Sequence, residues 1–284
     1  MSAEKITIEK LKRMKKKGEK ITMITSYDYP FASLADQVGI DVILVGDSVG
    51  MVVLGYENTL PVRLEDILHH TKAVTGAVKR ALVVADMPFL SYQIGVKEAI
   101  INAGRLIKEG LADAVKIEGG KNVTHIVKAL VDANIPVMGH IGLTPQRIKI
   151  FGRYRVRGKS IDEAIKLIND ARALEEAGVF SIVLELIPAE VAKIITEEVS
   201  IPTIGIGAGP YCDGQVLVIH DILGLFERFV PKFVKRYTNL SDEIRKAISE
   251  YIADVKEKRF PEKEHSFFMS EDEYKELLKR LGRS

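Results

Sequence analysis

One short stretch sets out the plan of this chain: Val42-Ile43-Leu44-Val45-Gly46-Asp47-Ser48-Val49-Gly50. It begins as a continuous apolar run and ends at a carboxylate, a hydroxyl and two glycines. An apolar run of this length is typical of a parallel strand that is buried on both faces. We therefore predict a buried strand whose carboxyl end opens into a polar site.

Seven further apolar runs repeat this design, and amphipathic helix patterns separate them. Nearly every run ends in polar or ionisable residues. Eight such units predict an α/β fold of the (β/α)₈ TIM barrel type, whose active site lies at the carboxyl ends of the strands. An open doubly wound sheet gathers ligands at the same place and is the alternative, but eight units favour the barrel. The further runs are Ile21–Asp28, Leu82–Phe89, Ala114–Gly120, Val137–Leu143, Ser181–Ile187, Pro202–Gly209 and Gln215–Asp221.

The length of 284 residues slightly exceeds that of one such barrel. We expect one catalytic domain over residues 1–262, with an N-terminal helix between Thr7 and Gly18, and a C-terminal helical extension over residues 263–284. A capping box predicts a short helix over Ser270–Leu281. Before it, Ser241 is expected to cap a helix with an inward apolar face made of Ile244, Ile248, Tyr251, Ile252 and Val255.

The composition argues against several classes of protein. A formal net charge of +2 gives no electrostatic case for a nucleic acid or a membrane surface as partner. The single cysteine, Cys212, excludes an intramolecular disulfide and fits a reducing compartment. No apolar run approaches the length of a membrane span, and no signal segment follows Met1. We therefore expect a cytoplasmic protein that acts on small molecules.

Two long connections follow predicted strands. Val49–Pro61 is unusually apolar, and connections of this length are usually lids or binding surfaces; a contact between subunits is the alternative. Thr144–Lys159 carries six cationic residues around Phe151 and Tyr154. It could hold an acidic substrate tail, form a subunit contact or be a mobile surface loop, and the sequence favours none of these.

Three carboxylates end neighbouring strands of the predicted barrel: Asp47, Asp86 and Glu118. Like charges this close raise one another's pKa, so they call for a cation. A set of donors made only of oxygen atoms, without His or Cys, favours a hard cation, and Mg²⁺ is the first candidate. A single Asp at a strand end is more often a helix cap, but three in adjacent strands favour a metal site.

Two further ionisable residues extend this group. Lys116 precedes Glu118 by two residues, so both point into the barrel, where the ammonium can balance a substrate carboxylate or an enolate oxygen. A Schiff-base lysine is the alternative. Glu185 lies between Leu184 and Leu186 on the sixth strand. We expect an isolated carboxylate in this apolar frame to abstract a proton, since the sequence shows no obvious buried basic partner for it.

Other strand ends carry weaker signals. His140 and Tyr27 are assigned secondary roles, and His140 either orients a substrate or is a hydrogen-bonded core histidine. The glycines of Gly205–Gly209 lack the spacing of a dinucleotide loop and suggest close approach of the backbone to a ligand. His220 and Asp221 are expected to be structural.

With these residues in place, the sequence closely resembles the ketopantoate hydroxymethyltransferase (3-methyl-2-oxobutanoate hydroxymethyltransferase) family of the phosphoenolpyruvate/pyruvate barrel superfamily. The likeness runs in order from about Ile21 to Pro261, and Ser266–Ser284 extends past the usual end of family members. The matching motifs are Thr25-Ser26-Tyr27-Asp28, Val45-Gly46-Asp47-Ser48-Val49-Gly50-Met51, Thr59-Leu60-Pro61-Val62, Ala85-Asp86-Met87-Pro88-Phe89, Val115-Lys116-Ile117-Glu118-Gly119-Gly120, Gly139-His140-Ile141-Gly142-Leu143-Thr144-Pro145-Gln146 and Ile204-Gly205-Ile206-Gly207-Ala208-Gly209.

The resemblance implies a reaction and roles for these residues. The reaction transfers a hydroxymethyl group from 5,10-methylenetetrahydrofolate, or a related pterin, to 3-methyl-2-oxobutanoate, within pantothenate and coenzyme A biosynthesis. The implied Mg²⁺ ligands are Asp47, Asp86 and Glu118, and Glu185 is the implied base. The implied keto-acid contacts are Asp47, Ser48, Asp86 and Lys116.

Other functions and the assembly are also weighed. A Mg²⁺-dependent C–C lyase or mutase acting on a 2-oxo acid enolate is the alternative enzyme, although Cys212 does not resemble the reactive loop cysteine expected of a lyase. A non-catalytic scaffold would not need the carboxylates. The resemblance also implies a homo-oligomer, with a decamer as one size.

Overall fold

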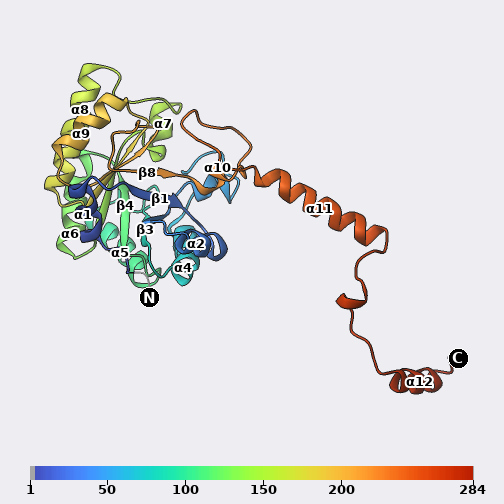
Figure 1. The fold of residues 1–284 in the computed structure, drawn as a ribbon. Helices are drawn as coiled ribbons and strands as arrows, with labels where there is room; N and C mark the ends of the chain where they lie inside the picture. The colour runs from blue at the N-terminus through green and yellow to red at the C-terminus, as the bar shows by residue number, and fades with distance from the viewer. Residues whose placement is uncertain (1–3, 284) are drawn as a thin grey trace. The chain divides into compact units, whose positions relative to one another are not determined.

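The structure, a computed structural model, describes residues 4–283 and is built on a closed barrel of parallel strands (Figure 1). The strands follow one another around the barrel in sequence order, and β8 pairs with β1 to close it. Closure confirms the predicted (β/α)₈ barrel and excludes the open sheet. The strands are β1 (Ile21–Thr25), β2 (Val42–Val45), β3 (Leu82–Asp86), β4 (Ala114–Glu118), β5 (Val137–Gly142), β6 (Ser181–Glu185), β7 (Thr203–Ile206) and β8 (Gly214–Leu217).

All eight predicted strands are present, but most end earlier than predicted. β1 ends at Thr25 instead of Asp28, and β3 ends at Asp86 instead of Phe89. The last strand ends at Leu217 because Ile219–Ile222 forms the short helix α10. The residues that follow the strands thus leave the sheet and are free to line a site.

Helices connect the strands on the outside of the barrel (Figure 1). α1 (Ile8–Lys17) begins where predicted, because Thr7 Oγ1 accepts a hydrogen bond from Lys10 N at 3.2 Å. It ends at Gly18, which has the left-handed φ of 69°. The other outer helices are α2 (Tyr29–Gln37), α4 (Leu64–Ala77), α5 (Val96–Lys108), α6 (Thr124–Asp132), α8 (Ile161–Glu176) and α9 (Ala189–Glu198).

Two apolar clusters form the core. The larger one packs the helices against the outer face of the strands. The smaller one fills the barrel and joins Leu11 and Met14 of α1 to the first residues of several strands, among them Ile21, Val42 and Leu82. Helix α1 therefore covers the amino-terminal end of the barrel with apolar side chains, and the polar strand ends lie at the opposite end.

The two long connections contain short helices. α3 (Val49–Val52) occupies the start of the apolar connection after β2. The basic connection after β5 begins with the 3₁₀ turn η2 (Pro145–Arg147), which runs into α7 (Ile148–Phe151). Neither connection is therefore a plain loop, and both follow strands that carry predicted site residues.

The chain divides into two compact units, residues 1–236 and residues 237–284. The predicted division lay at residue 262, so α11 (Leu240–Lys256) falls in the second unit instead of the barrel domain. Asn239 is the N-cap of α11, and Ser241 is its second residue, so the predicted cap is wrong by two positions. The predicted inward face is also wrong: Ile244, Ile248, Tyr251, Ile252 and Val255 are 44 to 58% exposed.

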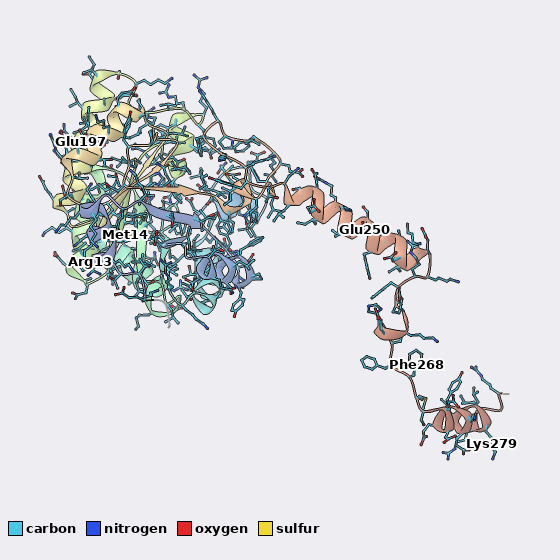
Figure 2. The ribbon with its side chains drawn as sticks, in the orientation of Figure 1. Arg13, Met14, Glu197, Glu250, Phe268 and Lys279 are labelled. Carbon is cyan, nitrogen blue, oxygen red and sulfur yellow. The ribbon has the colours of Figure 1, made fainter. Side chains whose placement is uncertain are left out.

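The rest of the second unit holds η3 (Lys263–His265) and α12 (Glu271–Arg280). The predicted cap of α12 is confirmed, because Ser270 Oγ accepts a hydrogen bond from Glu273 N at 3.3 Å. Between these two elements Phe268 projects from the ribbon and is 74% exposed (Figure 2). No helix within residues 4–283 is long and apolar enough to cross a membrane.

Candidate active site

A cavity of about 510 Å³ opens at the carboxyl ends of the strands, inside the barrel unit. Most of its wall is apolar, and one group of ionisable side chains projects into it. A cavity of this size, with few convergent polar groups, suits a small molecule. The ionisable side chains that line it are Asp47, Asp86, Lys116, Glu118, His140, Glu185, Asp221 and Lys232.

Asp47 lies in the turn after β2, Asp86 ends the neighbouring strand β3, and a hydrogen bond joins the two residues. Asp47 N donates a hydrogen bond to Asp86 Oδ2 at 3.1 Å, and both side chains are buried. Burial, with the charges of Asp86 and Glu118, holds the pKa of Asp47 well above its usual range. Burial also raises the pKa of Asp86, although the adjacent Lys116 opposes this effect.

Lys116 and Glu118 are two residues apart on β4 and point into the barrel together, as predicted. Lys116 Nζ lies 2.9 Å from Asp86 Oδ1, because these two residues are register partners on β3 and β4. Burial disfavours the charge on Lys116, but the surrounding carboxylates Asp86, Glu118 and Asp47 outweigh burial and raise its pKa. The lysine is therefore a buried cation at neutral pH and not the neutral amine that a Schiff base requires.

His140 connects the carboxylates of β4 and β6. Its Nδ1 lies 3.2 Å from Lys116 Nζ and 3.5 Å from Glu118 Oε1, and its Nε2 lies 3.2 Å from Glu185 Oε2. Burial and Lys116 both disfavour the imidazolium, but hydrogen bonds to Glu118 and Glu185 raise the pKa of His140 to about 9. The predicted isolation of Glu185 is therefore wrong, because His140 is its buried partner.

Gln146, in η2, belongs to the site although sequence reasoning passed over it. Its Nε2 donates to Asp47 Oδ2 at 3.1 Å, and its backbone N donates to Glu118 Oε2 at 3.1 Å. Its Oε1 accepts a hydrogen bond from Tyr92 OH at 3.0 Å, and the Gln146 side chain is buried. One residue thus holds the carboxylate in the turn after β2 and the carboxylate at the end of β4.

Ser48 and Tyr27 form a second hydrogen-bonded pair. Tyr27 OH lies 2.8 Å from Ser48 Oγ, and Ser48 lines the cavity. The Tyr27 ring is buried and packs 5.5 Å from the His220 ring, centroid to centroid. Tyr27 can therefore fix the orientation of the Ser48 hydroxyl, and its secondary role stays a prediction.

Two weaker predictions fare differently. The glycines after β7 are in close contact with other parts of the protein, and a ligand does not need the space beside them. A Cβ on Gly207 would lie 2.9 Å from the Phe233 ring, and one on Gly209 would lie 2.5 Å from Ala189 Cβ. Asp221 lines the cavity, where burial raises its pKa to about 6. Asp221 was expected to be structural, and its place in the cavity was not foreseen.

The predicted metal site can be tested against these contacts. Within residues 4–283, no three His, Cys, Asp or Glu side chains lie close enough together to form a metal-binding group. Instead, Lys116 lies among Asp47, Asp86 and Glu118 and balances their charge. The donor chemistry still suits a hard divalent cation, because Asp86 Oδ1 and Glu118 Oε1 are buried carboxylate oxygens that face the cavity beside Lys116 and His140.

Solved structures share this barrel fold. A phosphonopyruvate hydrolase complex with oxalate and Mg²⁺ aligns over 97% of this chain and 94% of its own, with a TM-score of 0.58 and 14% identity. A 2,3-dimethylmalate lyase, described as a member of the PEP mutase/isocitrate lyase superfamily, aligns over 97% of this chain and 95% of its own with a TM-score of 0.55 and 14% identity. At such identities the likeness is one of fold and does not favour lyase or mutase chemistry here.

Sequence relatives are much more similar. The 3-methyl-2-oxobutanoate hydroxymethyltransferase of Carboxydothermus hydrogenoformans is 56% identical over 278 residues, 98% of this chain and 99% of its own length. The protein of the same name from Geobacter metallireducens is 59% identical over 93% of this chain and 98% of its own. The first alignment leaves out only a few residues, so most of the C-terminal segment has a counterpart in that relative.

The family model described as ketopantoate hydroxymethyltransferase matches residues 5–263, which include every strand of the barrel and every residue of the cavity. Together with the identities of 56 and 59%, this match shows that the chain belongs to the ketopantoate hydroxymethyltransferase family.

Proposed function

We propose that this protein transfers a hydroxymethyl group to 3-methyl-2-oxobutanoate and so forms 2-dehydropantoate, a step of pantothenate and coenzyme A biosynthesis. The observation that carries the proposal is the line of contacts from Asp86 through Lys116 and His140 to Glu185. It places a fixed positive charge and a carboxylate base in one small cavity, as the formation of an enolate from a keto acid requires.

The buried ammonium of Lys116 binds the negative charge of the substrate. A keto acid brings a carboxylate into the cavity, and proton loss at C3 adds charge at the keto oxygen. Lys116 can balance either charge without reorganisation, because the carboxylates around it already hold it in place. The Ser48 hydroxyl, held by Tyr27, is available to donate a hydrogen bond to a substrate oxygen.

Glu185 is the proposed base. Its Oε2 contacts His140 Nε2 at 3.2 Å, which fixes the carboxylate at the edge of the cavity. Glu185 takes the C3 proton, and the C3 carbon forms a bond to the methylene carbon of the carrier while one of the two bonds from that carbon to carrier nitrogens breaks. Water then replaces the second nitrogen and supplies the hydroxyl group of the product. The proton taken by Glu185 and the proton lost by water pass to the two nitrogens of the released carrier.

The resident metal and the carrier are part of the proposal. Asp47, Asp86 and Glu118 would hold Mg²⁺. When bound, the metal would supply the Lewis acidity that makes the C3 proton of the keto acid easier to remove. The proposed one-carbon donor is 5,10-methylenetetrahydrofolate or a related pterin. Cys212 is a buried free thiol, which supports the expected cytoplasmic location.

A homo-oligomer, with a decamer as one size, is also proposed. It is supported by the apolar side chains that the second unit exposes along α11 and at Phe267 and Phe268. The chain between Met51 and Leu54, where Val53 and Leu54 are exposed, is a second candidate contact.

The decisive experiment is NMR of deuterium exchange at C3 of 3-methyl-2-oxobutanoate, with and without Mg²⁺ and without pterin. We expect exchange by the native protein that depends on Mg²⁺ and is lost in Glu185→Gln. The matched control is Glu190→Gln, an exposed position on α9 that should leave exchange unchanged. Retained exchange in Glu185→Gln would remove this residue as the base.

A further inference from the structure

The connection between β5 and α8 is strongly cationic. Residues 144–159 contain no Asp or Glu, although the whole chain has a formal net charge of only +2. Among the described residues, one of the six cations has a recorded carboxylate partner: Arg157, whose guanidinium lies 3.2 Å from Glu163. So much uncompensated charge on one segment attracts anions. The six residues are Arg147, Lys149, Arg153, Arg155, Arg157 and Lys159.

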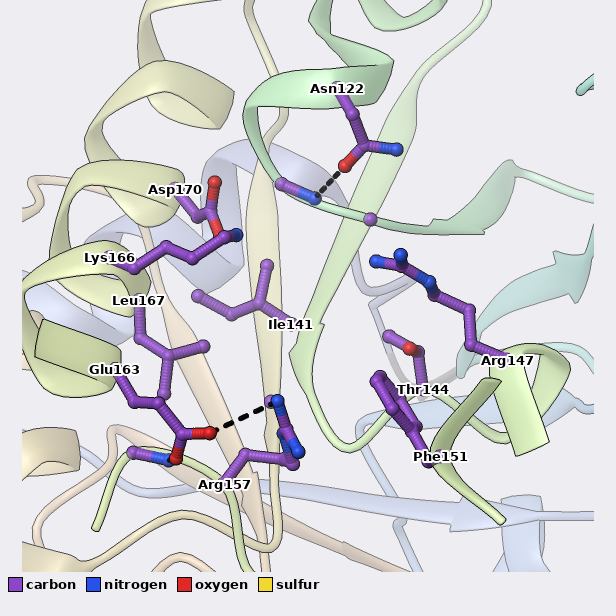
Figure 3. A pocket seen from close by; sticks show the side chains of 14 residues that line it. Asn122, Ile141, Thr144, Arg147, Phe151, Arg157, Glu163, Lys166, Leu167 and Asp170 are labelled. Carbon is purple, nitrogen blue, oxygen red and sulfur yellow. Dashed lines mark hydrogen bonds and ion pairs between the residues drawn. The ribbon is translucent and has the colours of Figure 1, made fainter. Parts of the chain in front are cut away.

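A second cavity lies under this connection, and we call it the outer pocket. It has a volume of about 190 Å³ and is enclosed between the end of β5, the chain after β4 and helix α8. Figure 3 shows the side chains of Arg147, Arg157 and Phe151 on its wall, with Lys166 and Asp170 of α8 also lining it. It is separate from the catalytic cavity, and its polar residues are not used by the proposed reaction.

Among residues 4–283, Arg147 is the one cation of the outer pocket without a carboxylate partner. Arg157 is paired with Glu163 at 3.2 Å, and Lys166 is paired with Asp170 at 2.6 Å. Arg147 has no carboxylate within ion-pair distance among the described residues, and its guanidinium lies 5.5 Å from the centre of the Phe151 ring. A planar guanidinium that is supported by an aromatic ring and lacks a partner suits bidentate binding of a carboxylate or phosphate.

The outer pocket adjoins the catalytic cavity along the chain. Pro145 lines the catalytic cavity, while Thr144 and Arg147 line the outer pocket. Gln146 lies between them and holds Asp47 and Glu118. Successive residues are about 3.8 Å apart, so one extended molecule can reach both cavities.

The catalytic cavity is lined by five carboxylates against three cationic residues, Lys116, His140 and Lys232, and the keto acid brings a further negative charge. An anionic tail on the one-carbon donor is therefore disfavoured there. It is favoured a few residues away, at the connection that has only cations.

We propose that the outer pocket binds a carboxylate of the acidic tail of the one-carbon carrier, with Arg147 as the anchoring cation. This inference rests on the proposed function and adds to it the means by which the enzyme recognises a folate-type donor. The pterin ring enters the catalytic cavity, and the tail passes over Pro145 and Tyr154 to the outer pocket.

The test compares Arg147→Gln with the native protein, using 5,10-methylenetetrahydrofolate and a methylene-loaded tetrahydropterin that lacks the aminobenzoylglutamate tail. Loss of a charge-assisted pair should raise the KM for the folate about tenfold and leave kcat nearly unchanged. The KM for the tail-less donor should not change, and Arg147→Lys should recover part of the loss. The matched control is Lys149→Gln, which removes the same charge from the same connection but not from the pocket wall.

Deuterium exchange at C3, measured without pterin, distinguishes a failure of the proposed function from a failure of the outer-pocket proposal. Absence of exchange in the native protein would contradict the proposed function. Normal exchange in Arg147→Gln with an unchanged KM for the folate would overturn the outer pocket alone, and so would an equal rise in KM for both donors. p-Aminobenzoylglutamate should inhibit the native protein competitively with the folate, whereas equal inhibition by inorganic phosphate at the same concentration would show a general anion site and overturn the assignment to the tail.

Discussion

The contacts of Gln146 show how the carboxylates of the site are held in position. It lies 99 residues from Asp47 in the sequence and still donates a hydrogen bond to that carboxylate. Its backbone N holds Glu118 as well. Because hydrogen bonds to charged groups are stronger than neutral ones, this single side chain fixes much of the geometry of the carboxylate group.

Replacing Gln146 by Leu should therefore impair catalysis more than folding. Loss of a hydrogen bond to a charged group costs about 1.5–3 kcal/mol, so kcat/KM should fall roughly 10- to 100-fold. Steady-state kinetics checks this, with Gln37→Leu as control, because Gln37 is bonded on the surface to Ser33. A normal kcat/KM in Gln146→Leu would show that the carboxylates are held by other groups.

Asp221 gives a prediction for the dependence of stability on pH. Burial raises its pKa to about 6, above the value of about 3.9 for an unfolded Asp, so the folded state binds the proton more tightly. Its contribution to stability is full below pH ~4 and is lost as pH rises through ~6. The Asp221→Asn variant has no carboxyl group to titrate at this position, so it does not lose this stability as the pH rises.

Between pH 4 and pH 7, the free energy of unfolding of Asp221→Asn should therefore rise relative to that of the native protein. The gain is at most about 3 kcal/mol, because the pKa of Asp221 differs by about two between the folded and unfolded states. Urea unfolding at both pH values measures the difference. The same difference at both pH values would mean that Asp221 titrates normally in the folded protein.

At the residue scale, the sequence predicted six of the ionisable groups that line the cavity, but not Asp221 or Lys232 and not the supporting residues. Asp47, Asp86, Lys116, Glu118, His140 and Glu185 all line one cavity, because polar residues at the ends of buried strands are conspicuous. Gln146 was missed because an amide in a loop has no such signature. The contact between His140 and Glu185 depends on the stagger of β5 and β6, which the sequence does not give.

At the scale of the elements, the turn after β4 depends on one glycine. A Cβ on Gly120 would lie 2.1 Å from Asp170 Cγ, and Asp170 Oδ1 accepts a hydrogen bond from Lys121 N at 2.8 Å. The turn and α8 are therefore in direct contact, with no space for a side chain at position 120.

Gly120→Ala should lower the thermal stability, because overpacking of this kind costs about 1–3 kcal/mol. Gly104→Ala is the matched control: this glycine lies inside α5 with no atom within 4 Å of the added Cβ, so the change should stabilise by about 0.5–1 kcal/mol. Thermal unfolding followed by circular dichroism gives both values. Shifts of the same sign would contradict the packing argument.

The elements also show where sequence patterns succeed and fail. Buried parallel strands are continuous apolar runs, so all eight were found. The apolar stripe of α11 was found too, but a stripe does not say which surface covers it, and its five residues are exposed in this chain. The pattern predicts a helix and leaves its partner open.

At the scale of the whole molecule, the second unit is where copies of the chain should meet. Its exposed apolar face on α11 includes Ile248, and an added charge there opposes burial against another copy. Ile248→Glu should therefore shift the native mass to a smaller assembly, as measured by analytical ultracentrifugation. Ser249→Glu adds the same charge one residue further along the helix and should leave the mass unchanged. Equal masses for both variants would exclude this face as the contact.

The three-residue turn η2 can couple the binding of the keto acid to the binding of the one-carbon carrier. The proposed keto-acid site adjoins the carboxylates that Gln146 holds, and the proposed site of the carrier tail is at Arg147, the next residue along the chain. Binding of one ligand therefore restricts the element that the other ligand also needs. Such thermodynamic linkage is reciprocal: the factor by which the donor tightens keto-acid binding is the factor by which the keto acid tightens donor binding. If this coupling is positive, each substrate binds more tightly when the other is present, and the apparent KM for the keto acid falls as the donor concentration rises.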